Sequence, residues 1–264
     1  MTRRFLIVSP ARSGSTALRL AINVQAGALC HGEILGKNRI LGLSNKVGKL
    51  SQIPGLTPQM RQDDPDGFLR LMLAQPDVPC QGFKALYSHF YLEQNAYLLN
   101  RVLADDPAVV VLWRRDLVRR FRSECLLRVE KELWRPKRFS RVSPEEVIAD
   151  ARVQMAMVAG IHAMLRGHGV RRVMDLDFED LVAGPEATGR VLDFLGLDAS
   201  RTRLVKDRRT RRNEASGPSV GIPPVFDAAE LDHLRDVSLE RALSEGGTGG
   251  GWWNAGSQPG QFSP

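Results

Sequence analysis

Short apolar runs that alternate with stretches of helical periodicity constrain the fold of this chain more than any other feature of its sequence. Four runs, at 5–9, 82–86, 109–113 and 173–176, have the length and apolar composition of buried strands. The run at 109–113 is apolar throughout, which is typical of a strand in the middle of a parallel sheet. Strands separated by helices predict an α/β fold of three layers, with a central and mainly parallel sheet.

Helices are predicted between these strands from apolar positions spaced three and four residues apart. The predicted helices cover 13–26, 90–104, 117–133, 145–166 and 185–195. The last of them has Pro185 near its first turn and Gly196 just beyond its end, and these are the positions in helices where proline and glycine are enriched. Residues 36–67 are rich in Gly, Pro and Asp with weak periodicity, and we expect a long excursion from the sheet there.

Length and composition are those of a globular domain. The chain has 264 residues, of which 43% are hydrophobic and 25% charged, so a core can form without a disulfide or a metal. We expect one domain over 1–245 and a disordered, glycine-rich tail over 246–264. The three cysteines are scattered and lack CxxC spacing, which favours a reducing, cytoplasmic setting. No apolar stretch reaches the roughly 18 residues of a membrane span.

Positive charge is concentrated in two segments. The net charge is +7, and segments 114–141 and 201–212 carry all of the excess, mostly as arginine. The planar fork of arginine suits phosphate or carboxylate groups, so these segments indicate an anionic ligand. They equally fit solvated basic faces, or contact with a membrane surface, which nothing in the sequence requires. No RNP, zinc-finger or helix-turn-helix signature is present, so no nucleic-acid partner is predicted.

The segment between the first strand and the first helix has the length of a Walker A loop. Residues 9–16 read SPARSGST, which places Gly14 and Thr16 in register with the second glycine and the Ser/Thr of GxxxxGK[ST]. Such a turn directs backbone N–H groups and the positive end of a helix at one point, where a phosphate binds. It predicts a fold like that of the P-loop NTPases. The alternative is an ordinary helix start capped by Ser or Thr.

Two departures from that motif argue against a magnesium-dependent NTPase. Ser9 replaces the first glycine, and Ser15 replaces the lysine that would reach the β- and γ-phosphates. Trp113, Arg114 and Arg115 follow the third strand, where an aspartate would hold Mg²⁺. No metal is therefore predicted. A divergent, kinase-like nucleotide-binding enzyme remains the alternative function, and magnesium dependence would distinguish it.

A second anion site is indicated eight residues after Arg115, at Ser123. An arginine at a strand end and a hydroxyl in the next helix could hold a second phosphate. Together, PARSGST and VLWRRDLVRRFRS resemble the 5′-phosphosulfate loop and the 3′-phosphate motif of sulfotransferases that use 3′-phosphoadenosine 5′-phosphosulfate (PAPS). LDFEDLVAGP at 176–185 and VLDFLGL at 191–197 are similar to later segments of that family, so the resemblance spans about residues 4–200.

Two further segments resemble the bacterial carbohydrate branch of the family, such as the trehalose, nodulation-factor and lipopolysaccharide sulfotransferases. They are HGEIL at 31–35 and GFKAL at 82–86. The resemblance implies that the acceptor is a hydroxyl group on a sugar-containing molecule. We expect acceptor contacts from 36–67, 90–104 and 124–166, whereas the oligomeric state is not predicted.

The resemblance also implies roles for single residues in donor binding. The 5′-phosphosulfate would be held by Arg12, Ser13, Gly14, Ser15 and Thr16. The 3′-phosphate would be held by Ser123 with Arg115, or with Arg114 one residue earlier. The 201–212 run departs from the C-terminal segment of the animal enzymes, and its role is left open.

Catalytic roles follow from the same resemblance. Glu33 matches the catalytic glutamate of the carbohydrate branch and would take the proton of the acceptor hydroxyl, with His31 as the rival base. Lys84 would neutralise the sulfonate or the bridging oxygen. The alternatives are a core histidine at His31, a helix-cap carboxylate at Glu33 and a surface lysine at Lys84. A last set of acidic residues is interpreted as loop and capping residues around the fourth strand: Asp177, Glu179 and Asp180.

Overall fold

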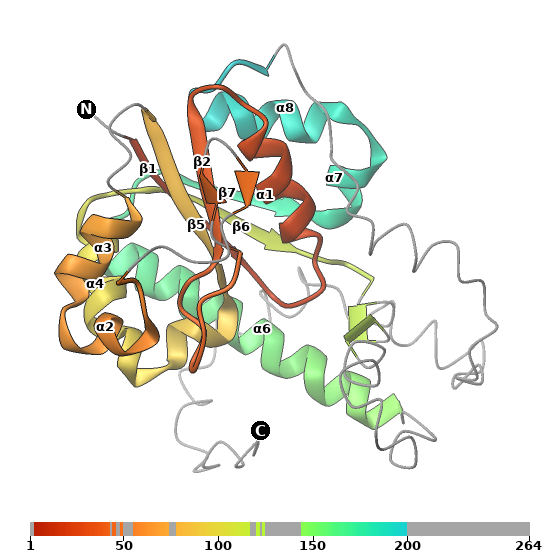
Figure 1. The fold of residues 1–264 in the computed structure, drawn as a ribbon. Coiled ribbons are helices and arrows are strands. Elements are labelled where there is room, and N and C mark those ends of the chain that lie inside the picture. The colour runs from red at the N-terminus through yellow and green to blue at the C-terminus, as the bar shows by residue number, and fades with distance from the viewer. Residues whose placement is uncertain are drawn as a thin grey trace, which may run out of the picture.

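A five-stranded, fully parallel sheet forms the centre of the protein, as Figure 1 shows for this computed structural model. The strand order is β2-β5-β1-β6-β7. The strands are β1 (Arg3–Ser9), β2 (Ala28–Glu33), β5 (Cys80–Leu86), β6 (Ala108–Trp113) and β7 (Val173–Asp177). After β1, the chain first adds β2 and β5 at one edge of β1 and then adds β6 and β7 at its other edge. The direction in which strands are added therefore reverses beside β1. Ligands of open parallel sheets bind at the carboxyl ends of the strands next to such a reversal.

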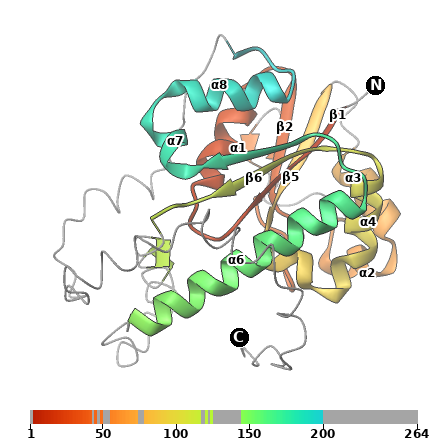
Figure 2. The ribbon, with the colours of Figure 1, turned by 180° about the vertical axis from the view of Figure 1, so that it is seen from behind.

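Two layers of helices cover the sheet, which confirms the predicted three-layer α/β fold (Figure 2). Phe5 and Ile7 of β1 pack on one side, and Leu6 and Val8 pack on the other, because successive residues of a strand point to opposite faces. The first layer holds α1 (Ser15–Asn23), α7 (Phe178–Ala183) and α8 (Pro185–Phe194). The second holds α2 (Pro58–Asp63), α3 (Pro65–Met72), α4 (Ala96–Ala104) and α6 (Pro144–Gly167).

Smaller elements complete the fold. Two 3₁₀ turns, η1 (Tyr87–Tyr91) and η2 (Glu93–Asn95), lead from β5 into α4, and β3 (Ser44–Asn45) pairs with β4 (Gly48–Lys49) in a small hairpin. The structure describes residues 3–42, 44–45, 48–49, 55–73, 78–116, 120–121, 123–124 and 144–199. Most of the predicted helix at 117–133, the arginine-rich 201–212 run and the predicted tail at 246–264 lie outside these ranges. In the described ranges, no helix is both long and apolar enough to cross a membrane.

All four predicted strands are confirmed, with no end displaced by more than two residues. The sequence analysis missed the edge strand β2, because His31, Gly32 and Glu33 interrupt its apolar run. It also missed α2, which lies within the predicted excursion at 36–67, and α3, which begins at the end of that excursion. These helices have only six and eight residues, too few for a clear period. Of the three residues interpreted as loop and capping residues, Asp177 is the capping residue of α7, whereas Glu179 and Asp180 lie in its first turn rather than in a loop.

Candidate active site

The turn between β1 and α1 leaves the start of α1 without a side-chain cap. Gly14 is the capping residue, and the first turn of α1 holds no acidic side chain. The starts of α2 and α3 differ, because Thr57 Oγ1 accepts the N–H of Met60 and an Asp64 carboxylate oxygen accepts the N–H of Gly67. The first N–H groups of a helix have no carbonyl partner within the helix and carry its positive end. The start of α1 is therefore suited to an anion from outside the chain.

Two residues of this loop have left-handed backbone conformations. Gly14 has a φ of 76°, and Arg12, which is not a glycine, has a φ of 65°. Left-handed residues in a tight turn gather successive N–H groups into a concave anion-binding nest. A left-handed arginine costs roughly 1–2 kcal/mol, so neighbouring contacts have to hold it. One of them is the Arg114 guanidinium, whose Nη1 donates to the Arg12 carbonyl at 2.9 Å.

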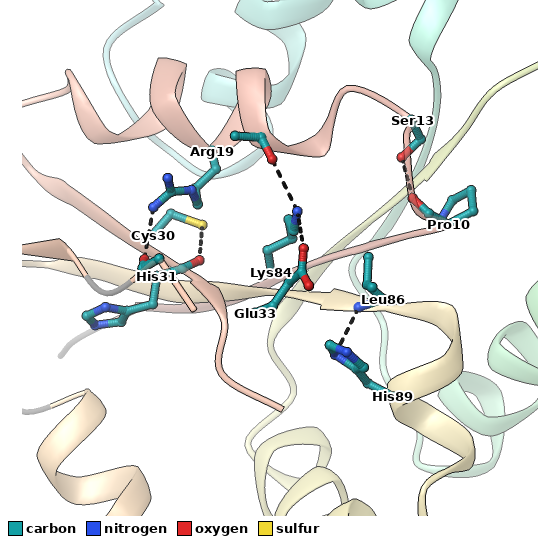
Figure 3. A network of polar contacts seen from close by, with 11 residues as sticks. Pro10, Ser13, Arg19, Cys30, His31, Glu33, Lys84, Leu86 and His89 are labelled. Carbon is teal, nitrogen blue, oxygen red and sulfur yellow. Dashed lines mark hydrogen bonds and ion pairs between the residues drawn. The ribbon is translucent and has the colours of Figure 1, made fainter. Parts of the chain in front are cut away.

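Further polar contacts join the loop to the residues predicted for a second phosphate. Ser13 Oγ donates to the Pro10 carbonyl at 2.8 Å within the loop (Figure 3). The side chain of Arg12 donates from Nε to Ser123 Oγ at 2.9 Å. Arg114 and Ser123 therefore both contact Arg12, and the structure brings the two predicted anion-binding segments together.

Arg115 lies in a different environment. Its guanidinium faces the end of β7, with Nη2 at 2.9 Å from Asp180 Oδ1 and Nε at 3.5 Å from Asp177 Oδ2. Glu179 accepts the backbone N–H groups of Arg115 and Asp116. Desolvation by burial raises the pKa of Asp177, and Arg115 acts in the opposite direction. The three carboxylates that were interpreted as loop and capping residues thus hold the carboxyl end of β6.

A second polar cluster joins β2, β5 and α1. Lys84 Nζ lies 2.8 Å from Glu33 Oε1, a contact drawn in Figure 3. The same ammonium group donates to Thr16 Oγ1 at 3.2 Å. The side chain of Lys84 is 7% exposed and that of Glu33 is 26% exposed. Lys84 is therefore not a surface lysine, and Glu33 ends a strand rather than capping a helix. The cluster connects the predicted catalytic pair to the predicted phosphate loop.

A bulge in β2 separates Glu33 from His31. The register pairs His31 with Phe83 and Glu33 with Lys84, so β2 contains one extra residue, Gly32. In a regular strand, residues i and i+2 share a face, and a bulge redirects the following side chain. Glycine fits here, because a Cβ on Gly32 would lie 2.4 Å from the backbone oxygen of Leu41.

His31 points toward α3 and is fully buried. Its Nε2 lies 2.9 Å from the carbonyl oxygen of Met72 (Figure 3 shows the ring directed away from Lys84). A carbonyl only accepts, so Nε2 carries a proton. Burial lowers the pKa of His31 to about 4, and it does the same for His89, whose Nδ1 accepts the N–H of Leu86. Both rings are therefore neutral at neutral pH.

Phe178 is a residue of this region that sequence reasoning did not select. The Arg114 guanidinium lies 4.6 Å from the centre of its ring. The ring also lies against the loop, where a Cβ on Gly14 would come within 2.3 Å of it. The only sequence signal is the place of Phe178 in LDFEDLVAGP, which resembles a family segment without indicating such a contact.

A cavity of about 530 Å³ lies between α2 and the η2–α4 region. Its polar lining includes Lys37, Gln62, Glu93, Gln94 and Tyr97. The segment after Glu33 forms one wall, because Arg61 and Gln94 both donate to the Lys37 carbonyl. The cavity thus lies in two of the regions expected to contact an acceptor. Throughout the described ranges, no three His, Cys, Asp or Glu side chains are grouped as metal ligands are.

Neither a family model nor a curated protein sequence matches this chain. Among solved structures, a sulfotransferase from Alicyclobacillus acidocaldarius is similar to it at 17% sequence identity and a TM-score of 0.49. That match covers 92% of this chain and 99% of the other. A similarity at this level leaves the substrate and the mechanism of this chain to be inferred from its own residues.

Proposed function

We propose that this chain is a sulfotransferase that moves the sulfuryl group of PAPS to an acceptor hydroxyl. The observation that carries the proposal is the cluster at the carboxyl edge of the sheet. There Lys84 joins the Glu33 carboxylate to Thr16, in the first turn of a helix whose start has no side-chain cap. A turn suited to an anion, beside a partly buried lysine–carboxylate pair, fits the transfer of an anionic group to a hydroxyl.

Donor binding is assigned to the loop and to the arginines around it. The N–H groups at the start of α1 bind the 5′-phosphosulfate, within the loop formed by Arg12, Ser13, Gly14, Ser15 and Thr16. Arg12, Arg114 and Ser123 are linked by hydrogen bonds and form the candidate site of the 3′-phosphate. Arg115 can contact the 3′-phosphate only if its guanidinium gives up its contacts with Asp177 and Asp180. A site for two separate phosphates favours PAPS over ATP.

The transfer conserves atoms and charge without another reactant. The acceptor oxygen forms a bond to sulfur as the bond between sulfur and the bridging oxygen breaks, and the bonding electron pair stays on that oxygen. Negative charge therefore grows on the 5′-phosphate, where the positive end of α1 and the Lys84 ammonium stabilise it. Glu33 receives the proton of the acceptor hydroxyl.

Glu33 is a better candidate for the base than His31. The ring of His31 lies on the α3 side of the sheet, and its Nε2 proton is held by the Met72 carbonyl. Glu33 lies on the α1 side because of the bulge at Gly32, next to Lys84. Only the carboxylate thus lies beside the proposed donor loop.

The acceptor is proposed to carry its hydroxyl on a sugar. The cavity beside the segment that follows Glu33 combines an ammonium, amides, a carboxylate and a phenol with the apolar side chains of Pro65, Leu92 and Leu98. A concave site that mixes hydrogen-bonding groups with one aromatic ring suits a hydroxyl-rich ligand. Lys37, which lines this cavity, lies four residues after Glu33 in the chain.

Calorimetry tests the donor assignment. The purified protein is titrated with 3′-phosphoadenosine 5′-phosphate, the desulfated product, and with ADP, each in EDTA and in Mg²⁺. We expect micromolar binding of the bisphosphate in EDTA and at least tenfold weaker binding of ADP. Equal or tighter binding of ADP that needs Mg²⁺ would instead support a kinase-like enzyme, and binding of neither nucleotide would also overturn the proposal.

A matched variant sharpens the result. Ser123→Ala removes one hydroxyl from the candidate 3′-phosphate site and should weaken the bisphosphate several-fold. Adenosine 5′-phosphosulfate lacks the 3′-phosphate, so its affinity should not change. An equal loss for both ligands would contradict the assignment of Ser123. Transfer of labelled sulfate from PAPS to sugar acceptors then tests the reaction itself.

A further inference from the structure

We propose that Phe178 is a positioning residue of the donor loop, which holds Arg114 against the loop before any ligand binds. This inference rests on the proposed function for its ligand, but its contacts belong to the free protein. Phe178 touches neither sulfur nor acceptor in the scheme above, and it acts through Arg114 and Gly14.

Strand pairing brings Phe178 to this place. The parallel register of β6 and β7 pairs Trp113 with Asp177. Arg114 and Phe178 are the residues that directly follow β6 and β7, so the chain leaves the two strands at neighbouring positions. The guanidinium lies 4.6 Å from the ring centre, within the range of a cation–π contact. Because Arg114 is only 8% exposed, water competes little for that cation.

The other side of the ring restrains the loop. A Cβ on Gly14 would come within 2.4 Å of two ring carbons of Phe178, so the ring and the glycine backbone are in close contact. Gly14 also accepts the first hydrogen bonds of α1, from the N–H groups of Ala17 and Leu18. One aromatic ring therefore contacts both Gly14, the capping residue of α1, and the cation that holds Arg12.

The contact has a consequence for Arg12. Its left-handed backbone is unfavourable by itself, and the bond from Arg114 Nη1 to its carbonyl holds it. Arg114 keeps that direction because the Phe178 ring lies beneath its guanidinium. Without the ring, the loop would have to be ordered when the donor binds, and that ordering would lower the affinity.

Three substitutions separate an aromatic role from simple packing. Phe178→Leu keeps an apolar side chain and removes the ring face, whereas Phe178→Tyr keeps the ring. Phe194→Leu is a matched control, because Phe194 is also partly buried and lies 5.2 Å from the guanidinium of Arg172, away from the loop. If the leucine variant at 178 does not fold, as judged by thermal melting, Phe178→Met provides the same comparison.

Two readouts are measured on the full chain. The first is the calorimetric affinity for 3′-phosphoadenosine 5′-phosphate, which should fall about tenfold in Phe178→Leu, the size of a partly desolvated cation–π contact. The second is hydrogen exchange of the Ala17 and Leu18 amides in the free protein, which should become faster. Phe178→Tyr should have the same affinity and the same exchange rates as the unchanged protein, and so should Phe194→Leu.

The outcomes are decisive in either direction. The proposal is overturned if Phe178→Leu changes neither readout, or if Phe178→Tyr is as impaired as Phe178→Leu. If the unchanged protein fails to bind the bisphosphate, the proposed function falls. The exchange readout then still decides whether Phe178 orders the loop, so the two failures are distinguishable.

Discussion

Two ion-pair clusters lie at the same edge of the sheet and differ in their exposure to water. At the ends of β2 and β5, Lys84 meets Glu33 in a pair whose members are 7% and 26% exposed. At the ends of β6 and β7, Arg115 meets several carboxylates, and its own side chain is 57% exposed. An exposed pair contributes little to stability, typically about 0–1 kcal/mol.

The less exposed pair requires another explanation. Desolvation of two charges often cancels their attraction, so apolar residues would serve stability as well at the Lys84–Glu33 position. What the apolar residues would not supply is a carboxylate and a cation beside the first turn of α1. The comparison supports the proposal that the cluster on β2 and β5 serves chemistry, whereas the contacts of the cluster on β6 and β7 hold the end of a strand.

The largest expected effect is on catalysis by Glu33→Gln. The amide keeps the size of the side chain but cannot take a proton, so kcat should fall by about 10²–10⁴. The affinity for 3′-phosphoadenosine 5′-phosphate should stay within about threefold, because Glu33 does not hold the donor in the proposed scheme. Initial rates with labelled PAPS and calorimetry measure the two quantities.

A control for that substitution is Glu186→Gln in the first turn of α8, which removes an exposed carboxylate outside the site. Its rate should match that of the unchanged enzyme. If Glu33→Gln kept most of its activity while His31→Gln lost it, the base would be on the α3 side of the sheet. The Lys84–Glu33 cluster would then not supply the catalytic base.

A smaller effect concerns the buried histidines near the first cluster. The pKa of His31 and of His89 is lowered to about 4, from about 6.5 in an unfolded chain, chiefly by burial. Between these values the unfolded state binds more protons, so stability is complete above pH 6.5 and is lost as the pH falls toward 4. The free energy of unfolding should drop by about 2 kcal/mol for each histidine between pH 7 and pH 5.

Urea unfolding at several pH values measures this loss. His31→Gln can still donate to the Met72 carbonyl but has no titratable ring, so the pH dependence should be about half that of the unchanged protein. A variant with the original slope would show that His31 does not carry the effect. The Arg115 cluster is exposed and should contribute little over the same range.

Most of the fold was predictable because its signals are local. The apolar runs of β1, β5, β6 and β7 and the helical spacing of α6 and α8 each lie within one segment of sequence. The edge strand β2 was not predictable from its apolar pattern, since it ends in His31, Gly32 and Glu33. Its place depends on pairing with β5, some fifty residues later in the chain.

The candidate site was predictable in its parts but not in its arrangement. The resemblance to PAPS-dependent sulfotransferases selected Arg12, Glu33 and Lys84 as candidates, and the spacing from Arg115 also pointed to Ser123. They did not predict that a bulge directs Glu33 toward Lys84, or that Arg12 bonds to Ser123. The choice between Arg114 and Arg115 could not be made either, because these are adjacent arginines after β6 and only the folded chain gives them different partners.

The smallest expected effect is at Asp180, and it tests whether Arg115 belongs to the donor site. Asp180 lies 2.9 Å from Arg115 in an exposed pair, so Asp180→Asn should change the free energy of unfolding by less than about 1 kcal/mol. It should also release Arg115 in part. If Arg115 can turn toward the 3′-phosphate, the bisphosphate should bind about two- to threefold more tightly, and adenosine 5′-phosphosulfate should bind as before. An equal change for both ligands would mean that Arg115 only fixes the end of β6. Arg114 would then be the arginine that faces the second phosphate, and the division between a reactive and a structural cluster would be complete.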